Sequence, residues 1–209
     1  MKVRRILGLL LLILFSSCKE KSPVPKPRSY LRLNLPNHEY SKMHIIHPCF
    51  SYNFDFGSYG SVGDFILNDK QPFFYFEPQK FTQFSSRQII DIGYLNGRME
   101  LFSFKFQTKD SLKKLIDFSC DLVDEDKIMI DSDSYQRVID SKNSVYGTMF
   151  YLRGNSAHNF RFHFTDSTSR FVLGFLRFNC TPNYDSLRPV IDYLKVDMDR
   201  MLSSFRWNK

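Results

Sequence analysis

Three short runs in the C-terminal third of the chain alternate apolar and polar residues. They cover residues 145–153, 159–165 and 170–179. A period of two is typical of half-buried strands, and the short polar segments between the runs predict an antiparallel meander. In the middle run, Phe160, Phe162 and Phe164 form the apolar face. Its other face carries Arg161, His163 and Thr165, so we expect burial on one side only, followed by a polar hairpin turn at residues 166–169.

The segment after Pro182 changes to helical spacing. Between residues 185 and 205 one face collects the apolar residues Leu187, Val190, Ile191, Leu194, Met198, Met201, Leu202 and Phe205. This stripe predicts an amphipathic helix that covers a sheet. Asn183 or Asp185 is expected to accept hydrogen bonds from its first free amides. Pro189 is expected in or near the first turn, where its missing N–H costs little.

The pattern between residues 30 and 122 is weaker. It predicts strands at residues 30–35, 50–56 and 99–106, a loop around Gly57, Gly60 and Gly63, a short aromatic run at residues 73–76, and a helix capped by Asp110 with Leu112, Leu115, Ile116 and Leu122 on one face. We therefore expect an α+β fold: an antiparallel β-sheet with a long C-terminal helix and one shorter central helix packed on one face.

The N-terminus has the order of a secretory signal. Basic residues precede the apolar run at residues 6–15, which is too short to span a membrane, and the small pair Ser16 and Ser17 then leads to Cys18. This end resembles a bacterial lipobox, although Phe15 stands where Leu is usual. We predict a lipoprotein signal peptide at residues 1–17, a flexible tether at residues 18–28 with lipid-modified Cys18, and a single globular domain at residues 29–209.

Composition adds limits to this picture. The 209 residues are 43% hydrophobic and 16% aromatic, enough for one core. Of the 29 basic residues, cleavage removes Lys2, Arg4 and Arg5, which leaves 26 against 22 acidic ones, a net charge of +4 that is too mild to indicate nucleic acid. Besides Cys18 there are Cys49, Cys120 and Cys180, so at most one disulfide forms among them; the sequence leaves open which pair, or whether any does.

Candidate chemistry is sparse along the chain. His44 and His47 with Cys49 are metal-ligand types, but no second ligand pair has zinc spacing. The acidic residues between 121 and 133 lack the glycine and the terminal glutamate of a calcium loop and are typical of a solvated charged loop. The glycines at residues 57–63 match no phosphate-binding motif, and no Gly-x-Ser-x-Gly elbow occurs. We expect no catalytic residues, no metal and no cofactor, hence not an enzyme.

Several short motifs nevertheless carry a family resemblance. In chain order they are residues 25–28 with Tyr30 and Leu35–Pro36, Pro48–Cys49, Gly154–Asn155, residues 164–167, Pro182–Asn183 with residues 185–187 and Pro189, and residues 204–207. Together they resemble the gliding motility lipoprotein GldD family across the mature chain. The match is weakest from about residue 73 to residue 141, where an aromatic run without Trp and an acidic stretch suggest a divergent member.

The resemblance implies a cell-envelope lipoprotein needed for bacterial gliding motility and the linked type IX secretion system. We favour a non-enzymatic lipoprotein that docks on other proteins of this machinery. Its lipid is expected to lie in the outer membrane, with the domain facing the periplasm. Asn155, Asp166, Asn183 and Trp207 are the candidate docking or structural residues. The alternative is a lipid-anchored periplasmic binding module that carries a small ligand or cell-wall fragment in a pocket between helix and sheet.

Overall fold

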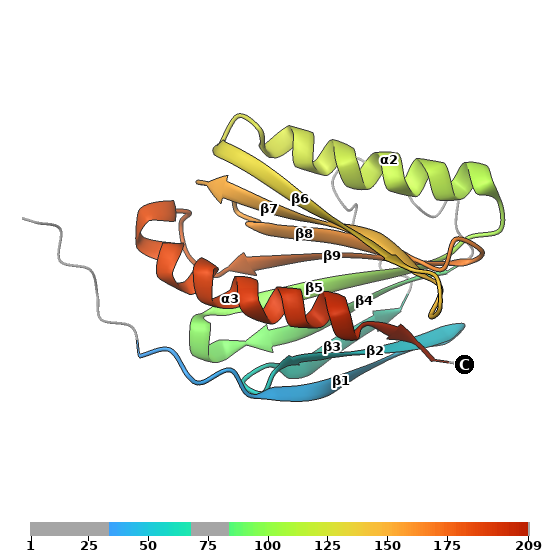
Figure 1. Cartoon of the computed structure of the whole chain (residues 1–209), viewed down its shortest axis with the longest axis horizontal. Helices are drawn as coiled ribbons and strands as arrows, with labels where there is room; N and C mark the ends of the chain where they lie inside the picture. The colour runs from blue at the N-terminus through green and yellow to red at the C-terminus, as the bar shows by residue number, and fades with distance from the viewer. Residues whose placement is uncertain (1–33, 68–83, 209) are drawn as a thin grey trace, which may run out of the picture. The chain divides into compact units, whose positions relative to one another are not determined.

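The computed structural model describes residues 34–67 and 84–208, and all of them belong to one compact unit, Leu33–Lys209 (Figure 1). These residues form two sheets and two long helices. The predicted α+β class is therefore confirmed. Neither described helix is both long and apolar enough to cross a membrane.

Seven antiparallel strands form the large sheet, in the order β3-β4-β5-β9-β8-β7-β6. Their bounds are β3 Ser61–Leu67, β4 Phe84–Ile92, β5 Gly97–Lys105, β6 Ile130–Asp140, β7 Val145–Gly154, β8 Phe160–Thr165 and β9 Arg170–Phe178, and a short 3-10 helix, η2 (Gly93–Leu95), joins β4 to β5. Strands β7, β8 and β9 follow one another as the predicted meander. The long connection from β5 to β6 contains the central helix, which lets β9 pair with β5 in the middle of the sheet.

A second, three-stranded sheet joins the two ends of the described chain. Its strands are β1 Tyr40–His47, β2 Phe50–Gly57 and the two-residue β10 Arg206–Trp207, with β2 in the centre. Trp207 pairs with Tyr52, so the last residues of the chain are held against the hairpin of β1 and β2.

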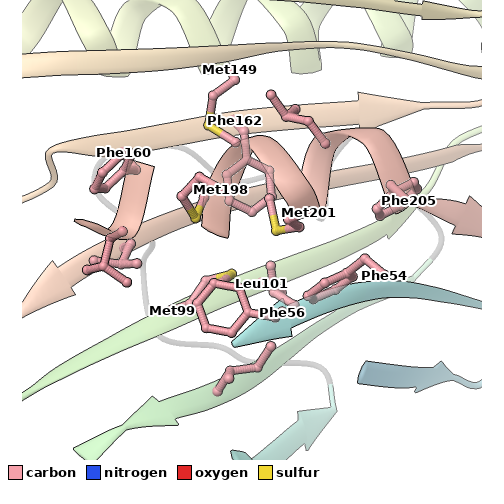
Figure 2. Close-up of a cluster of buried hydrophobic side chains, with 14 of the residues drawn as sticks. Phe54, Phe56, Met99, Leu101, Met149, Phe160, Phe162, Met198, Met201 and Phe205 are labelled. Atoms are coloured by element: carbon pink, nitrogen blue, oxygen red, sulfur yellow. The ribbon is translucent and has the colours of Figure 1, made fainter. Parts of the chain in front are cut away.

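Helix α3 (Tyr184–Ser204) covers one face of the large sheet. The side chains of Met198 and Met201 point toward residues from β2, β5, β7 and β8, among them Phe162 (Figure 2). Burial is nearly complete, since Met198 and Met201 are both at 0% exposure. Asn183 caps this helix by accepting from the Ser186 amide, as one of the two predicted alternatives requires. Pro189 lies in the second turn, close to the start of the helix as expected.

The central helix α2 (Lys109–Asp126) covers the opposite face of the large sheet, so the expectation that both helices share one face is corrected (Figure 1). Leu115 of α2 packs there with Phe102 of β5 and Leu173 of β9. The whole cluster on this side consists of Phe102, Phe104, Phe106, Leu115, Phe118, Leu122, Phe171, Leu173 and Phe175. The sheet is therefore the middle layer of three.

Because α2 covers this face, β8 is buried on both sides, and the prediction of burial on one side only is also wrong. Two of its polar residues have partners on α2. The side chain of Arg161 donates to Asp126 at 2.7 Å, and His163 Nδ1 lies 2.9 Å from the Ser119 hydroxyl. Burial lowers the pKa of His163 to about 4, so it is neutral at physiological pH. The alternation of apolar and polar residues in β8 thus separates an apolar face from a polar face, and both faces are buried.

Other expectations are corrected locally. Thr108, not Asp110, caps α2, and its hydroxyl accepts from the Ser111 amide at 3.1 Å. Gly63 lies in β3 and not in a loop. The acidic stretch is not one solvated loop, because its residues divide between α2 and β6. The strand expected at residues 30–35 does not form where it is described, at residues 34–35, and its first four residues and the aromatic run at 73–76 lie outside the described residues.

Candidate functional site

The hairpin turn between β8 and β9 is organised by one carboxylate. Asp166 Oδ1 accepts from the amides of residues 168, 169 and 170 at 2.8–2.9 Å, and Oδ2 accepts from Arg170 Nε at 2.7 Å. Burial by itself raises the pKa of Asp166, but the hydrogen bonds from Arg170 and the amides outweigh it and lower the pKa to about 2. Asp166 is therefore ionised, and its carboxylate stabilises the turn between β8 and β9.

Trp207 packs beside this hairpin. Its ring meets Phe205 edge-on at 4.9 Å between centroids, and the Arg170 guanidinium lies 5.1 Å from the ring centre. Trp207 Nε1 donates to the carbonyl of Ser144 at 2.9 Å. The half-buried ring thus links β10 to the β6–β7 turn and the β8–β9 hairpin.

The turn between β1 and β2 completes this corner of the molecule. An open cavity of about 490 Å³ is lined by residues of several segments, including His47, Cys49, Lys105 and Arg170. His47 Nδ1 accepts from the Cys49 amide at 3.1 Å, and burial, followed by the charge of Lys105, lowers the pKa of His47 to about 4. Three of the motifs that carry the resemblance, at residues 48–49, 164–167 and 204–207, therefore meet here.

The metal-ligand types of this turn do not form a cluster. His47 is buried while His44 is exposed on β1, and no group of three His, Cys, Asp or Glu suited to a metal occurs among the described residues. Cys49, Cys120 and Cys180 are free thiols.

Two further motifs, Gly154–Asn155 and Pro182–Asn183, meet at the start of α3. Asn155 Oδ1 accepts from the Tyr184 amide at 2.9 Å, next to the cap formed by Asn183. Gly154 has a φ of +139°, and a Cβ there would lie 2.5 Å from Ile130 Cα. These residues join the β7 end, the start of β6 and α3. Of the four candidates, Asp166 and Trp207 lie at one corner, whereas Asn155 and Asn183 lie together elsewhere.

The space between α3 and the sheets is filled by side chains. Tyr52, Phe56 and Met201 are at 0% exposure there (Figure 2 shows part of this cluster). The described residues in this layer pack against one another, which disfavours the ligand pocket that the alternative function needs between helix and sheet.

Strand β6 presents a feature that the sequence analysis missed. It is the last strand of the large sheet, and no described strand pairs with its outer edge. Its Tyr135 and Ile139 are 61% and 75% exposed, and Ile128 and Met129 just before it are 90% and 62% exposed. The Asp and Ser residues of β6 are poor strand formers, so neither composition nor alternation predicts this strand. An exposed edge strand that carries apolar side chains such as Tyr135 and Ile139 is a template for pairing with another chain.

The comparisons agree with the motif positions. A family model described as gliding motility lipoprotein GldD matches residues 20–207. No curated protein and no solved structure matches the chain. Because the match covers nearly the whole chain, the protein belongs to the gliding motility lipoprotein GldD family.

Proposed function

We propose that the chain is a non-enzymatic lipoprotein that docks on other envelope components of the gliding machinery and the linked type IX secretion system. The exposed edge of β6 is the observation that supports docking most directly. The motif residues Asp166, Asn155 and Asn183 hold turns and a helix start through hydrogen bonds to backbone amides, which accounts for them without catalysis.

We further propose that acyl chains on Cys18 anchor the domain, at the outer membrane and facing the periplasm. The anchor is inferred from the lipobox-like end of the signal sequence, and the family is one of lipoproteins. With the domain confined near a membrane, its docking partner belongs to the same envelope compartment.

Docking at β6 has a defined physical form. A strand of the partner would add to the free edge through main-chain hydrogen bonds, while Tyr135 and Ile139 would supply apolar contacts that select the partner. Asp131 and Asp133 on the same strand discourage unspecific edge pairing, because a partner lacking a matching charge would leave them unpaired.

Site-specific photo-crosslinking in living cells tests this function. A photo-reactive amino acid replaces Ile139 in one strain and Val196, which is 47% exposed on α3, in a matched control. We expect Ile139 to crosslink to a protein of the gliding or secretion machinery and Val196 not to do so. Absence of such a crosslink at Ile139, or equal products at both positions, would contradict docking at this edge.

A further inference from the structure

The cavity beside the β1–β2 turn contains a hydrogen-bond donor without a partner. His47 lines this cavity and is only 3% exposed. The Cys49 amide can only donate, so His47 Nδ1 is the acceptor and the neutral ring carries its proton on Nε2. This Nε2 group is buried and has no hydrogen-bond partner. Buried polar groups are nearly always paired, so the free N–H favours a ligand that supplies an acceptor.

The charged residues of the cavity leave one positive charge in excess. Asp166 and Arg170 form an ion pair at 2.7 Å and balance each other. Lys105, at the end of β5, forms no ion pair in the part of the chain that the structure describes. Its charge helps to lower the pKa of His47 to about 4, so this ring stays neutral at physiological pH. A ligand with a single negative charge would therefore balance the cavity, whereas a dianion would place an excess negative charge near Asp166.

One side of the same cavity is an apolar wall, formed by Ile46, Pro48 and Phe50. The Phe50 ring packs against the His47 ring at 4.6 Å between centroids, so the donor lies next to this wall. Ile46 is 73% exposed, which is high for an isoleucine. An apolar group attached to the anion would cover this side chain and gain from its burial.

We propose that this cavity binds a small organic monocarboxylate. The Lys105 ammonium pairs with the carboxylate, His47 Nε2 donates to one of its oxygens, and a short apolar body lies on the apolar wall. The volume of about 490 Å³ is within the usual range of small-molecule sites. The lining includes no residue of β6, so the site does not depend on docking at that edge.

An NMR titration of the isotope-labelled mature chain in a nonionic detergent tests the proposal. The probe is butyrate, butyramide is the uncharged control of the same size, and sodium chloride keeps the ionic strength constant. We expect butyrate to shift the Nε2 signal of His47 in a saturable manner, while the signal of His163, which is buried under α2, stays in place. Butyramide should leave both signals unchanged. Absence of a saturable shift at His47, or an equal shift with butyramide, would overturn the proposal.

Variants test the two binding groups separately. Lys105→Gln should weaken butyrate binding about tenfold, because it removes the charged donor. His47→Asn should weaken it several-fold, with the Cys49 amide signal as the readout, because asparagine can still accept from that amide but lacks the Nε2 donor. Lys109→Gln, on the exposed start of α2, should leave the affinity unchanged.

Melting curves establish that each variant is folded. Lys105 is half-buried at a strand end, so its variant decides the question even if His47→Asn does not fold. Undiminished affinity in folded Lys105→Gln, or an equal loss in Lys109→Gln, would overturn the assignment of the carboxylate to Lys105.

Discussion

The carboxylate of Asp166 gives a quantitative prediction for stability. Asp166→Asn keeps the size of the side chain but removes the charge that faces Arg170 Nε at 2.7 Å and three backbone amides. The native pKa of Asp166 is about 2, against an ordinary value of 3.8, and its side chain is only 3% exposed, so solvent screens these contacts little. Each pKa unit corresponds to about 1.4 kcal/mol, so the ionised carboxylate contributes about 2 kcal/mol at pH 7.

The sign of the pH dependence follows from the lowered pKa. The contribution is fully present above the unfolded pKa and is lost as pH falls through the folded pKa, that is, between about pH 4 and pH 2. We therefore expect Asp166→Asn to lower the melting temperature by about 4–8 °C at pH 7 and by progressively less below pH 4. Urea unfolding across this pH range measures the difference.

A matched control removes a carboxylate that contributes little to stability. Asp192→Asn breaks an exposed pair with Arg188 at 3.6 Å and should change stability by less than about 1 kcal/mol. Equal stability of Asp166→Asn and the unchanged protein at pH 7, or a difference that persists undiminished at pH 2, would refute the role given to this carboxylate.

Three further predictions concern packing, docking and the anchor. Leu194→Asp and Leu202→Asp should each destabilise the domain by more than about 3 kcal/mol by burying an unpaired charge, whereas Val196→Asp, on the exposed side of α3, should change the thermal melt little. Trp207→Ala should lower thermal stability by about 2 kcal/mol through lost ring contacts; a stable variant that fails to support gliding would instead mark a docking residue, and normal stability with normal gliding would exclude both roles. Cys18→Ala should lose metabolic labelling by a fatty-acid probe, and continued labelling would remove the lipoprotein assignment.

Elements of the fold were predictable where the pattern of apolar residues has a single structural explanation. Helix α3 has a single apolar stripe, and β7 to β9 have short turns between them, so both were predictable. The run at residues 99–106 is apolar on both faces, with Met99 and Leu101 toward α3 and Phe102 and Phe104 toward α2. This was the available signal for helices on opposite faces, because strands buried on both sides lose their alternation.

The candidate site was less predictable from the sequence. Asp166 and Asn183 act locally, within four residues, so their turn and cap roles could be inferred from residue type. The pairing of β5 with β9 joins strands that are far apart in the chain, so no local pattern encodes it. The exposed edge of β6 likewise depends on strand order in the sheet.

Motility with an altered β6 edge tests the central claim most directly. Ile139→Lys places a charge on an exposed edge position, where it should leave folding intact but oppose an added strand. The account predicts a variant with normal melting temperature, abundance and acylation that fails to restore colony spreading in cells lacking the protein, whereas Val196→Lys restores it. Normal spreading with Ile139→Lys would contradict docking through β6.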